Sequence, residues 1–243
     1  MTETAVRQPA RTLIDPSRSG PYFAGLLLLA LISFWPSYLS QLGAQTAYTH
    51  LHASLAAVWL LMLVAQPILI RRGRRDYHRA LGRISYGLVP LILVSMILLA
   101  HSRIVGITGD AFPLRTYILY LQVSLVTVFV LCYALAVLTR RDMPVHARFM
   151  IGTGFTLIDP VLIRLMFWID DSPSWNYQWL TFGLTDLVIL TVIWLERDAR
   201  RGRWVFPAML AVFVVSQLPA LLQLTNTPGW QAFARWFASL PLT

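Results

Sequence analysis

The residues best suited to chemistry in this sequence are its five histidines, each of which lies at an end of a long apolar stretch. His78 opens the segment HRALGR and His146 opens HARFM, and each follows an arginine-rich loop. Two neutral imidazoles from different helices that face one gap are the ligands that haem b or a metal ion requires. Nearby Arg79, Arg83 and Arg148 would then hold the haem propionates. The alternative is that these side chains anchor helix ends among lipid headgroups.

Three more histidines, His50, His52 and His101, lie at the opposite ends of these stretches. Residues two positions apart on a helix point about 200° apart, so at most one of His50 and His52 faces the interior. We favour His52, because His52, Trp59 and Gln66 recur every seven residues and form one stripe. With a carboxylate, His52 and His101 supply the ligands of a zinc-dependent membrane hydrolase that acts on lipid. The sequence contains no HExxH segment to set the spacing of such ligands.

A third group of polar residues lies inside the apolar stretches, and its members are Gln122, Asp159, Arg164 and Asp186. An ionised side chain at membrane depth costs several kcal/mol unless it is paired. We therefore expect Asp159, Arg164 and Asp186 to face the interior and one another. Two interpretations stay open, a structural ion pair or the floor of an outward-opening cavity in a transporter of protons or small solutes.

These residues must be positioned by helices that cross a membrane, because apolar residues make up 57% of the 243-residue chain and its mean hydropathy is +0.61. A crossing helix needs about 20 mostly apolar residues. Seven stretches satisfy this requirement, at about 22–42, 49–70, 80–101, 116–139, 147–169, 177–196 and 204–224. The sequence therefore predicts an all-α integral membrane protein, a bundle of about seven transmembrane helices.

The distribution of charge predicts the orientation of this bundle. The net charge is +9, and all 20 basic residues are arginine. Most of them lie in the N-terminal tail and in the loops after the second, fourth and sixth stretches, which is the positive-inside pattern. We therefore expect a cytoplasmic N-terminus and an external C-terminus in a bacterial cytoplasmic (inner) membrane, with lipid headgroups rather than nucleic acid facing the arginines. The single cysteine, Cys132, excludes an intramolecular disulfide.

Three segments are predicted along the chain. Residues 1–21 are polar and contain prolines, and we expect a disordered cytoplasmic tail there. Residues 22–226 form the transmembrane domain. Residues 227–243 carry aromatic side chains at helical spacing after a Pro–Gly pair, which predicts an amphipathic helix at the outer membrane surface. The alternative for this last segment is an irregular aromatic terminus.

The core of the transmembrane domain, residues 46–170, shows an internal similarity. Residues 46–61 and 116–131 share several identical residues when they are aligned at an offset of 70. The loops that follow then place His78 and His146 at equivalent points. Apolar stretches also match by chance, so duplication of a two-helix unit and coincidence both stay open.

The chain resembles a widespread family of bacterial multi-pass membrane proteins in the ordered set His52, Gln66, HRALGR (78–83), HARFM (146–150) and Arg164. The resemblance covers roughly residues 46–170. It implies a membrane helical fold but no activity, because that family has no assigned function. The layout also resembles four-helix transmembrane b-type cytochromes, in which each helix supplies one haem ligand. The fourth stretch departs from that pattern, because it offers Gln122 where histidine is needed.

Histidines at both ends of the helices favour a membrane redox protein that binds haem b or a metal and exchanges electrons with a quinone or another redox partner. His78 and His101 lie on one stretch, 23 residues apart, which is about 34 Å along a helix. One haem or metal therefore fits more easily than two. The alternatives are the zinc-dependent lipid hydrolase and a non-catalytic transporter or assembly factor, the last of which needs no cofactor.

Overall fold

The structure, a computed structural model, describes residues 15–170 and 177–243. Throughout these ranges the regular elements are helices, which confirms the predicted all-α class. The α-helices are α1 (Gly20–Ser33), α2 (Ala47–Arg71), α3 (Arg75–Ile104), α4 (Ala111–Leu138), α5 (Met143–Phe155), α6 (Ile158–Ile169), α7 (Tyr177–Leu195), α8 (Val205–Leu221) and α9 (Pro228–Ala238). Short 3-10 helices are η1 (Pro16–Arg18), η2 (Leu39–Ala44) and η3 (Leu224–Asn226).

Within the described ranges, 5 helical segments are long and apolar enough to cross a membrane, namely α2, α3, α4, α7 and the consecutive pair α5–α6 (Met143–Ile169). In the most apolar part of α2, only 22% of the residues are buried inside the protein. Large apolar side chains such as Leu61 and Leu91 face outward instead. Such long apolar surfaces are suited to lipid rather than to water. α8 is also apolar but has 17 residues.

The first predicted stretch, 22–42, does not form one long helix. α1 has 14 residues, about 21 Å of rise, whereas the hydrocarbon layer is roughly 30 Å thick. Pro36 follows its end, and a residue without an N–H cannot continue the hydrogen-bond ladder. The chain then turns through η2, and the Tyr38 hydroxyl donates to His50 Nδ1 at 2.9 Å. This hydrogen bond ties the turn to the first residues of α2.

The centre of the bundle lies where α2, α4 and α5 meet. Trp59 on α2 is buried, and its ring packs edge-on against Phe129 and Tyr133 of α4, with centroids 5.2 and 5.7 Å away. The Trp59 indole N–H donates to Thr153 Oγ1 of α5 at 3.3 Å. One side chain thus joins three helices through apolar packing and a buried hydrogen bond.

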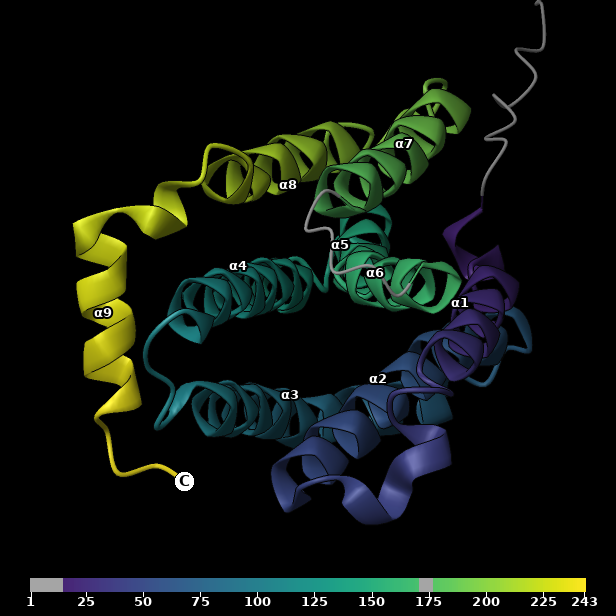
Figure 1. The fold of residues 1–243 in the computed structure, drawn as a ribbon. Coiled ribbons are helices and arrows are strands. Elements are labelled where there is room, and N and C mark those ends of the chain that lie inside the picture. Colours follow the sequence, from purple (N-terminus) through teal and green to yellow (C-terminus); the bar gives the residue numbers. More distant parts are fainter. Residues whose placement is uncertain (1–14, 171–176) are drawn as a thin grey trace, which may run out of the picture.

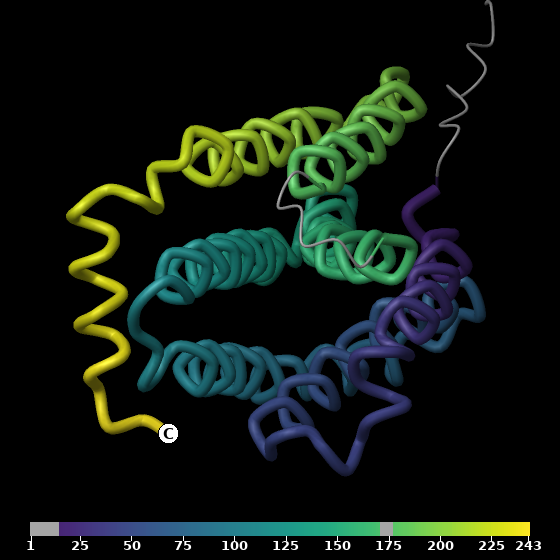
Figure 2. The backbone as a smooth tube through the Cα atoms, viewed as in Figure 1, coloured from purple at the N-terminus to yellow at the C-terminus, as the bar shows by residue number. Residues whose placement is uncertain are grey.

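α9 covers one end of the bundle. Figures 1 and 2 show it crossing the ends of α3 and α4, at a steep angle to both. Trp230 donates its indole N–H to the Thr116 carbonyl at 2.9 Å, and Ala234 is fully buried. Phe233 and Trp236 are exposed. A helix thus occupies the segment for which an amphipathic helix was predicted, and it has one packed and one aromatic exposed face.

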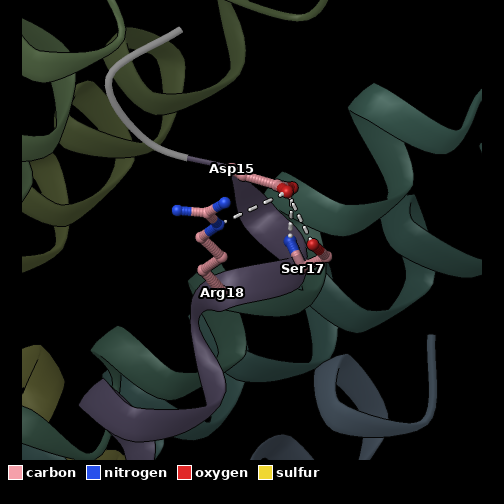
Figure 3. Close-up of polar contacts among 3 residues, drawn as sticks. All are labelled: Asp15, Ser17 and Arg18. Atoms are coloured by element: carbon pink, nitrogen blue, oxygen red, sulfur yellow. Dashed lines mark hydrogen bonds and ion pairs between the residues drawn. The ribbon is translucent and has the colours of Figure 1, made fainter. Parts of the chain in front are cut away.

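Residues 1–14 of the predicted disordered tail lie outside the described residues. The first described residue is Asp15. The Asp15 carboxylate accepts the backbone N–H of Ser17 at 2.9 Å and its hydroxyl at 2.7 Å, and Arg18 Nε lies 4.0 Å from the carboxylate (Figure 3). These contacts cap η1, and α1 follows from Gly20. Helical structure therefore begins before residue 21, the predicted end of the tail.

The two ends of the bundle differ in charge. The connections 72–74, 139–142 and 196–204 contain most of the loop arginines of the described chain, and we call the end formed by them the arginine-rich end. The opposite end is formed by the connections 34–46 and 105–110 and by α9. α3 and α5 both begin at the arginine-rich end, where the first candidate site lies.

Candidate functional site

His78 and His146 occupy equivalent positions at the arginine-rich end. His78 is the fourth residue of α3, and His146 is the fourth residue of α5. Each helix follows a short loop that closes a hairpin, α2–α3 in one case and α4–α5 in the other. The two imidazoles lie within electrostatic range of each other. Both predicted histidines therefore lie at the same end of the bundle, each near the start of a helix.

The tautomer of His146 is determined by a backbone carbonyl. His146 Nδ1 lies 2.8 Å from the Ala136 carbonyl oxygen near the end of α4. A carbonyl can only accept, so Nδ1 carries the proton, and Nε2 of the neutral ring keeps its lone pair. Metal-binding histidines are usually oriented in this way, with the non-ligating N–H bonded to a carbonyl or carboxylate.

His78 and Gln66 contribute two further polar atoms that lack partners. Gln66 Nε2 donates to the His78 backbone carbonyl at 3.3 Å, which holds the amide beside the start of α3. His78 Nδ1 and Gln66 Oε1 are both buried, and neither has a hydrogen-bond partner among residues 15–170 and 177–243. Buried polar atoms without partners are uncommon. Gln66 Oε1 is an acceptor, and His78 Nδ1 is one in the tautomer that carries its proton on Nε2.

Arg148, one of the arginines predicted beside this pair, is engaged elsewhere. Its Nε donates to Glu196 Oε2 at 2.6 Å, and its Nη1 donates to the Pro144 carbonyl at 2.7 Å. Both charged side chains are almost fully buried. Arg79 lies 3.8 Å from Asp76 in an exposed pair, and Arg83 is exposed as well. Arg79 and Arg83 therefore stay available at the surface, whereas Arg148 stabilises the fold.

Glu196 was not among the predicted site residues. It directly follows α7, and its position as the last residue of the stretch 177–196 was the signal in the sequence. Burial raises the pKa of its carboxyl above the usual range, and Arg148 opposes that rise by hydrogen bonding and by charge. The second oxygen, Oε1, is buried without a hydrogen-bond partner in the described chain. This pair attaches the loop 196–204 to the start of α5.

His52 and His101, the predicted zinc ligands, have separate surroundings. Ser95 Oγ donates to the Ile92 carbonyl at 2.8 Å, so it accepts from His52 Nδ1 at 3.1 Å. His101 Nδ1 instead lies 2.6 Å from Thr243 Oγ1. No group of three or more His, Cys, Asp or Glu side chains in the described residues could hold a metal ion. His52 and His101 therefore have different hydrogen-bond partners, Ser95 and Thr243.

His101 is buried beneath the C-terminal segment. It is 0% exposed, and its ring meets Phe237 of α9 edge-on, with centroids 5.4 Å apart. Its Nε2 is buried and has no hydrogen-bond partner in the described ranges. His50 is fully bonded, because its Nε2 donates to the Leu42 carbonyl at 3.2 Å and its Nδ1 accepts from Tyr38. Both residues therefore join chain segments at the end opposite the arginine-rich end.

Asp159 is the most deeply embedded of the predicted carboxylates. It lies in the first turn of α6 and is 4% exposed. Its Oδ1 accepts from Gln178 Nε2 at 2.7 Å and from Thr181 Oγ1 at 2.5 Å. Sequence reasoning missed these two donors, although Gln178, Thr181 and Thr185 form a polar stripe at helical spacing on an otherwise apolar helix.

The expected ion pairs among Asp159, Arg164 and Asp186 are wrong for the described chain, in which none of the three forms a salt bridge. Arg164 follows Asp159 by five residues, a rotation of about 140° around the helix, and its guanidinium lies 5.4 Å from the Phe34 ring centroid. Asp186 accepts from Gln217 Nε2 at 3.0 Å. Gln122 is half-buried on α4 and takes no part in this cluster's hydrogen bonds.

Comparison of the chain with protein-family models, with curated proteins and with solved structures finds no match. The resemblance of the HRALGR and HARFM segments to a bacterial membrane family therefore stays a prediction. The contacts described above are the basis for inferring a function.

Proposed function

We propose that this protein is a membrane redox protein that binds one metal centre, either haem b iron or a transition-metal ion, between His78 and His146. The carrying observation is that both imidazoles lie near helix starts at the arginine-rich end, within reach of each other's charge. His146 has Nε2 free because its Nδ1 is bonded to Ala136, and His78 has a buried ring nitrogen without a partner in the described chain. Electrons would pass to or from a quinone or another partner in the lipid bilayer.

The surroundings of the pair support a cation rather than an anion at this point. Gln66 Oε1, which has no partner among the described residues, is an acceptor, and His78 Nδ1 becomes one when its ring carries the proton on Nε2. A metal ion would need only the gap between the imidazoles, with Gln66 Oε1 as a third ligand. Haem would place iron in the same gap and would use the exposed Arg79 and Arg83 for its propionates. The two forms share the same histidine ligands and differ in their visible spectra.

The same proposal includes the membrane topology of the chain. We infer seven crossings, with α1 and α8 added to the five long helical segments, an N-terminus in the cytoplasm and a C-terminus outside. The arginines of the connections 72–74, 139–142 and 196–204 support this orientation by the positive-inside rule. The metal site would then lie at the cytoplasmic face of a bacterial inner membrane.

The test is an oxidised-minus-reduced visible spectrum and metal analysis of the detergent-purified protein. We expect about one haem or metal per chain, and about one-tenth of that content or less in His78→Ala and in His146→Ala, because each variant removes a ligand. Gln66→Leu should weaken binding less strongly. His50→Ala is the matched control, since that histidine lies at the opposite end of the bundle and bonds Tyr38.

Wild-type content in either His78→Ala or His146→Ala would overturn the proposal. Zinc that is retained in both variants but lost in His52→Ala would favour the hydrolase instead. A folded wild-type protein that takes up neither haem nor metal would leave the histidine pair a structural feature of the helix ends.

A further inference from the structure

The membrane segment Met143–Ile169 is interrupted near its middle. α5 ends at Phe155 and α6 begins at Ile158, about 20 Å from the start of the segment. Pro160 supplies no N–H for the helical ladder at this break. Thr156 and Leu157 between the two helices keep right-handed helical angles, so the interruption is a local loss of α-helical hydrogen bonds. Here Phe155 and Thr156 are buried by neighbouring helices.

Asp159 stands directly after this interruption, and the hydrogen-bond donors that it has in the described parts of the chain are neutral. Gln178 and Thr181 of α7 both bond Oδ1, so Oδ2 is the oxygen left for another partner. Among the described residues no arginine or histidine pairs with this carboxylate. An ionised carboxylate with no cation partner is costly at this depth. Binding a proton removes the charge while both existing hydrogen bonds remain.

A small cavity adjoins the carboxyl group. Its lining includes Asp159 together with the polar side chains of Ser124, Thr185, Ser216 and Gln217. The space is sufficient for about one water molecule, and several hydrogen-bonding groups are available to hold it. These residues belong to α4, α6, α7 and α8, and Figure 1 shows α7 and α8 on the side of α4 away from α3. The site is therefore separate from the histidine pair.

Few titratable groups face Asp159. Tyr117 of α4 lies within electrostatic range of it. Asp186 of α7 is the second carboxyl of this region, and Gln217, which lines the cavity, donates to it at 3.0 Å. α8 contains no titratable residue, and the one in α1, Tyr22, is exposed. α5 has His146 and Arg148 near its start, at the far end from the interruption.

We propose that Asp159 is a proton-binding site that exchanges with water in this cavity, with Asp186 as the next carboxyl group along the path. A hydronium ion gives its proton to Oδ2, which leaves a neutral carboxylic acid and a water molecule, and the reverse step returns the proton. Because Oδ1 already accepts two hydrogen bonds, the protonated Oδ2 donates into the cavity. The proposal does not depend on a metal at His78 and His146.

The test is infrared difference spectroscopy of the full-length protein in liposomes while the pH of the buffer is changed. We expect a carbonyl-stretch band of a protonated carboxylic acid that appears as the pH falls, shifts in D2O and is lost in Asp159→Asn. The amide still accepts through its oxygen, so the variant should fold. Asp76→Asn is the matched control, because that carboxylate is 97% exposed at the arginine-rich end.

Thr181→Val provides a second measurement. It removes a donor that favours the charged carboxylate, so the band's titration midpoint should move to higher pH by about 1 unit or more, a tenfold or greater rise in proton affinity. A merely structural role for Thr181 would lower the melting temperature without moving the midpoint.

Three outcomes would overturn the proposal. The first is a pH-dependent band that persists in folded Asp159→Asn. The second is an unmoved midpoint in Thr181→Val. The third is a wild-type spectrum that responds to Na⁺ but not to pH, which would assign the site to an alkali cation. Survival of the band in His78→Ala and His146→Ala would show that this site works independently of the metal centre.

Discussion

Arg148 and Glu196 form a buried ion pair that joins two segments of the chain, although removing both charges from water is unfavourable. Their side chains are 4% and 2% exposed, and 2.6 Å separates Nε from Oε2. Taking two charges out of water can cost more than their attraction returns. Burial of the Glu196 carboxyl, whose Oε1 has no hydrogen-bond partner in the described chain, therefore raises its pKa despite the adjacent guanidinium.

This raised pKa leads to a pH dependence of stability. Between the ordinary pKa of Glu196 and its raised value in the fold, the native protein binds more protons than the unfolded chain. The contribution of this group is therefore complete below the ordinary pKa and is lost as pH rises through the raised value. We expect the wild type to lose unfolding free energy relative to Glu196→Gln across that window, by about 1.4 kcal/mol per pH unit at most.

Melting curves in detergent at a series of pH values measure this difference. Asp76→Asn serves as the control. The Asp76 carboxylate is exposed, so its replacement should leave the pH profile of stability unchanged. A Glu196→Gln profile parallel to that of the wild type would contradict the assignment of the titration to Glu196.

At the scale of the element, α5 stands out because two glycines allow it to approach its neighbours closely. A Cβ at Gly152 would lie 2.0 Å from Met209 Cε of α8, and a Cβ at Gly154 would lie 2.2 Å from Phe23 Cε1 of α1. Small residues at such contacts let membrane helices pack backbone against side chain. α5 is thus held on two sides, just before the interruption that places Asp159.

Gly154→Ala should therefore destabilise the bundle. The buried Phe23 ring has little room to move, and overpacking of this kind costs about 1–3 kcal/mol. Gly183→Ala in α7 is the matched control, because nothing lies within 4 Å of its added Cβ. It should be neutral or should stabilise by about 0.5–1 kcal/mol.

Thermal unfolding in detergent compares the two glycine variants. Gly154→Ala combined with Phe23→Leu should recover part of the loss, because the smaller side chain makes room for the methyl group. Equal stabilities for Gly154→Ala and Gly183→Ala would contradict the close contact between α1 and α5.

The whole molecule is organised as hairpins that place arginines at one end and α9 at the other. α2–α3 and α4–α5 carry the histidine pair, and α7–α8 covers the opposite side of α4 (Figure 1). Because successive helices run in opposite directions, each loop is predicted to lie on one side of the membrane, and this side can be tested. The arrangement of the hairpins also places the proposed metal centre and the proposed proton site in different parts of the bundle.

Cysteine labelling checks the orientation. In a Cys132→Ser background, Asp76→Cys should react with a membrane-impermeant maleimide in inverted vesicles, and Asp110→Cys should react in intact spheroplasts. Both positions are exposed, Asp76 in the first turn of α3 and Asp110 six residues after its end. Labelling of both from the same side would contradict a crossing by α3, and the reversed result would place the N-terminus outside.

Helical class and the approximate positions of the long helices could be predicted from the sequence, because both depend on local properties. Runs of apolar residues set where α2, α3, α4 and α7 lie, and arginines between the runs mark one end of the bundle. The histidines at helix starts could be selected for the same reason. The early end of α1 was missed because the apolar residues up to Leu42 were counted in one stretch, although Pro36 and the polar residues Ser37, Ser40 and Gln41 already interrupt it.

Partners across helices were decided by the tertiary structure. Hydropathy placed Asp159 and Arg164 within one membrane stretch, but it does not show which neighbouring helix each side chain faces. In the structure Asp159 bonds donors on α7, and Arg164 lies over the Phe34 ring. In the sequence Glu196 is only a charged residue at a helix end, whereas in the structure it is buried against Arg148. Side-chain direction depends on how each helix is turned against its neighbours, and that rotation is set by the packing of all helices together rather than by any one segment.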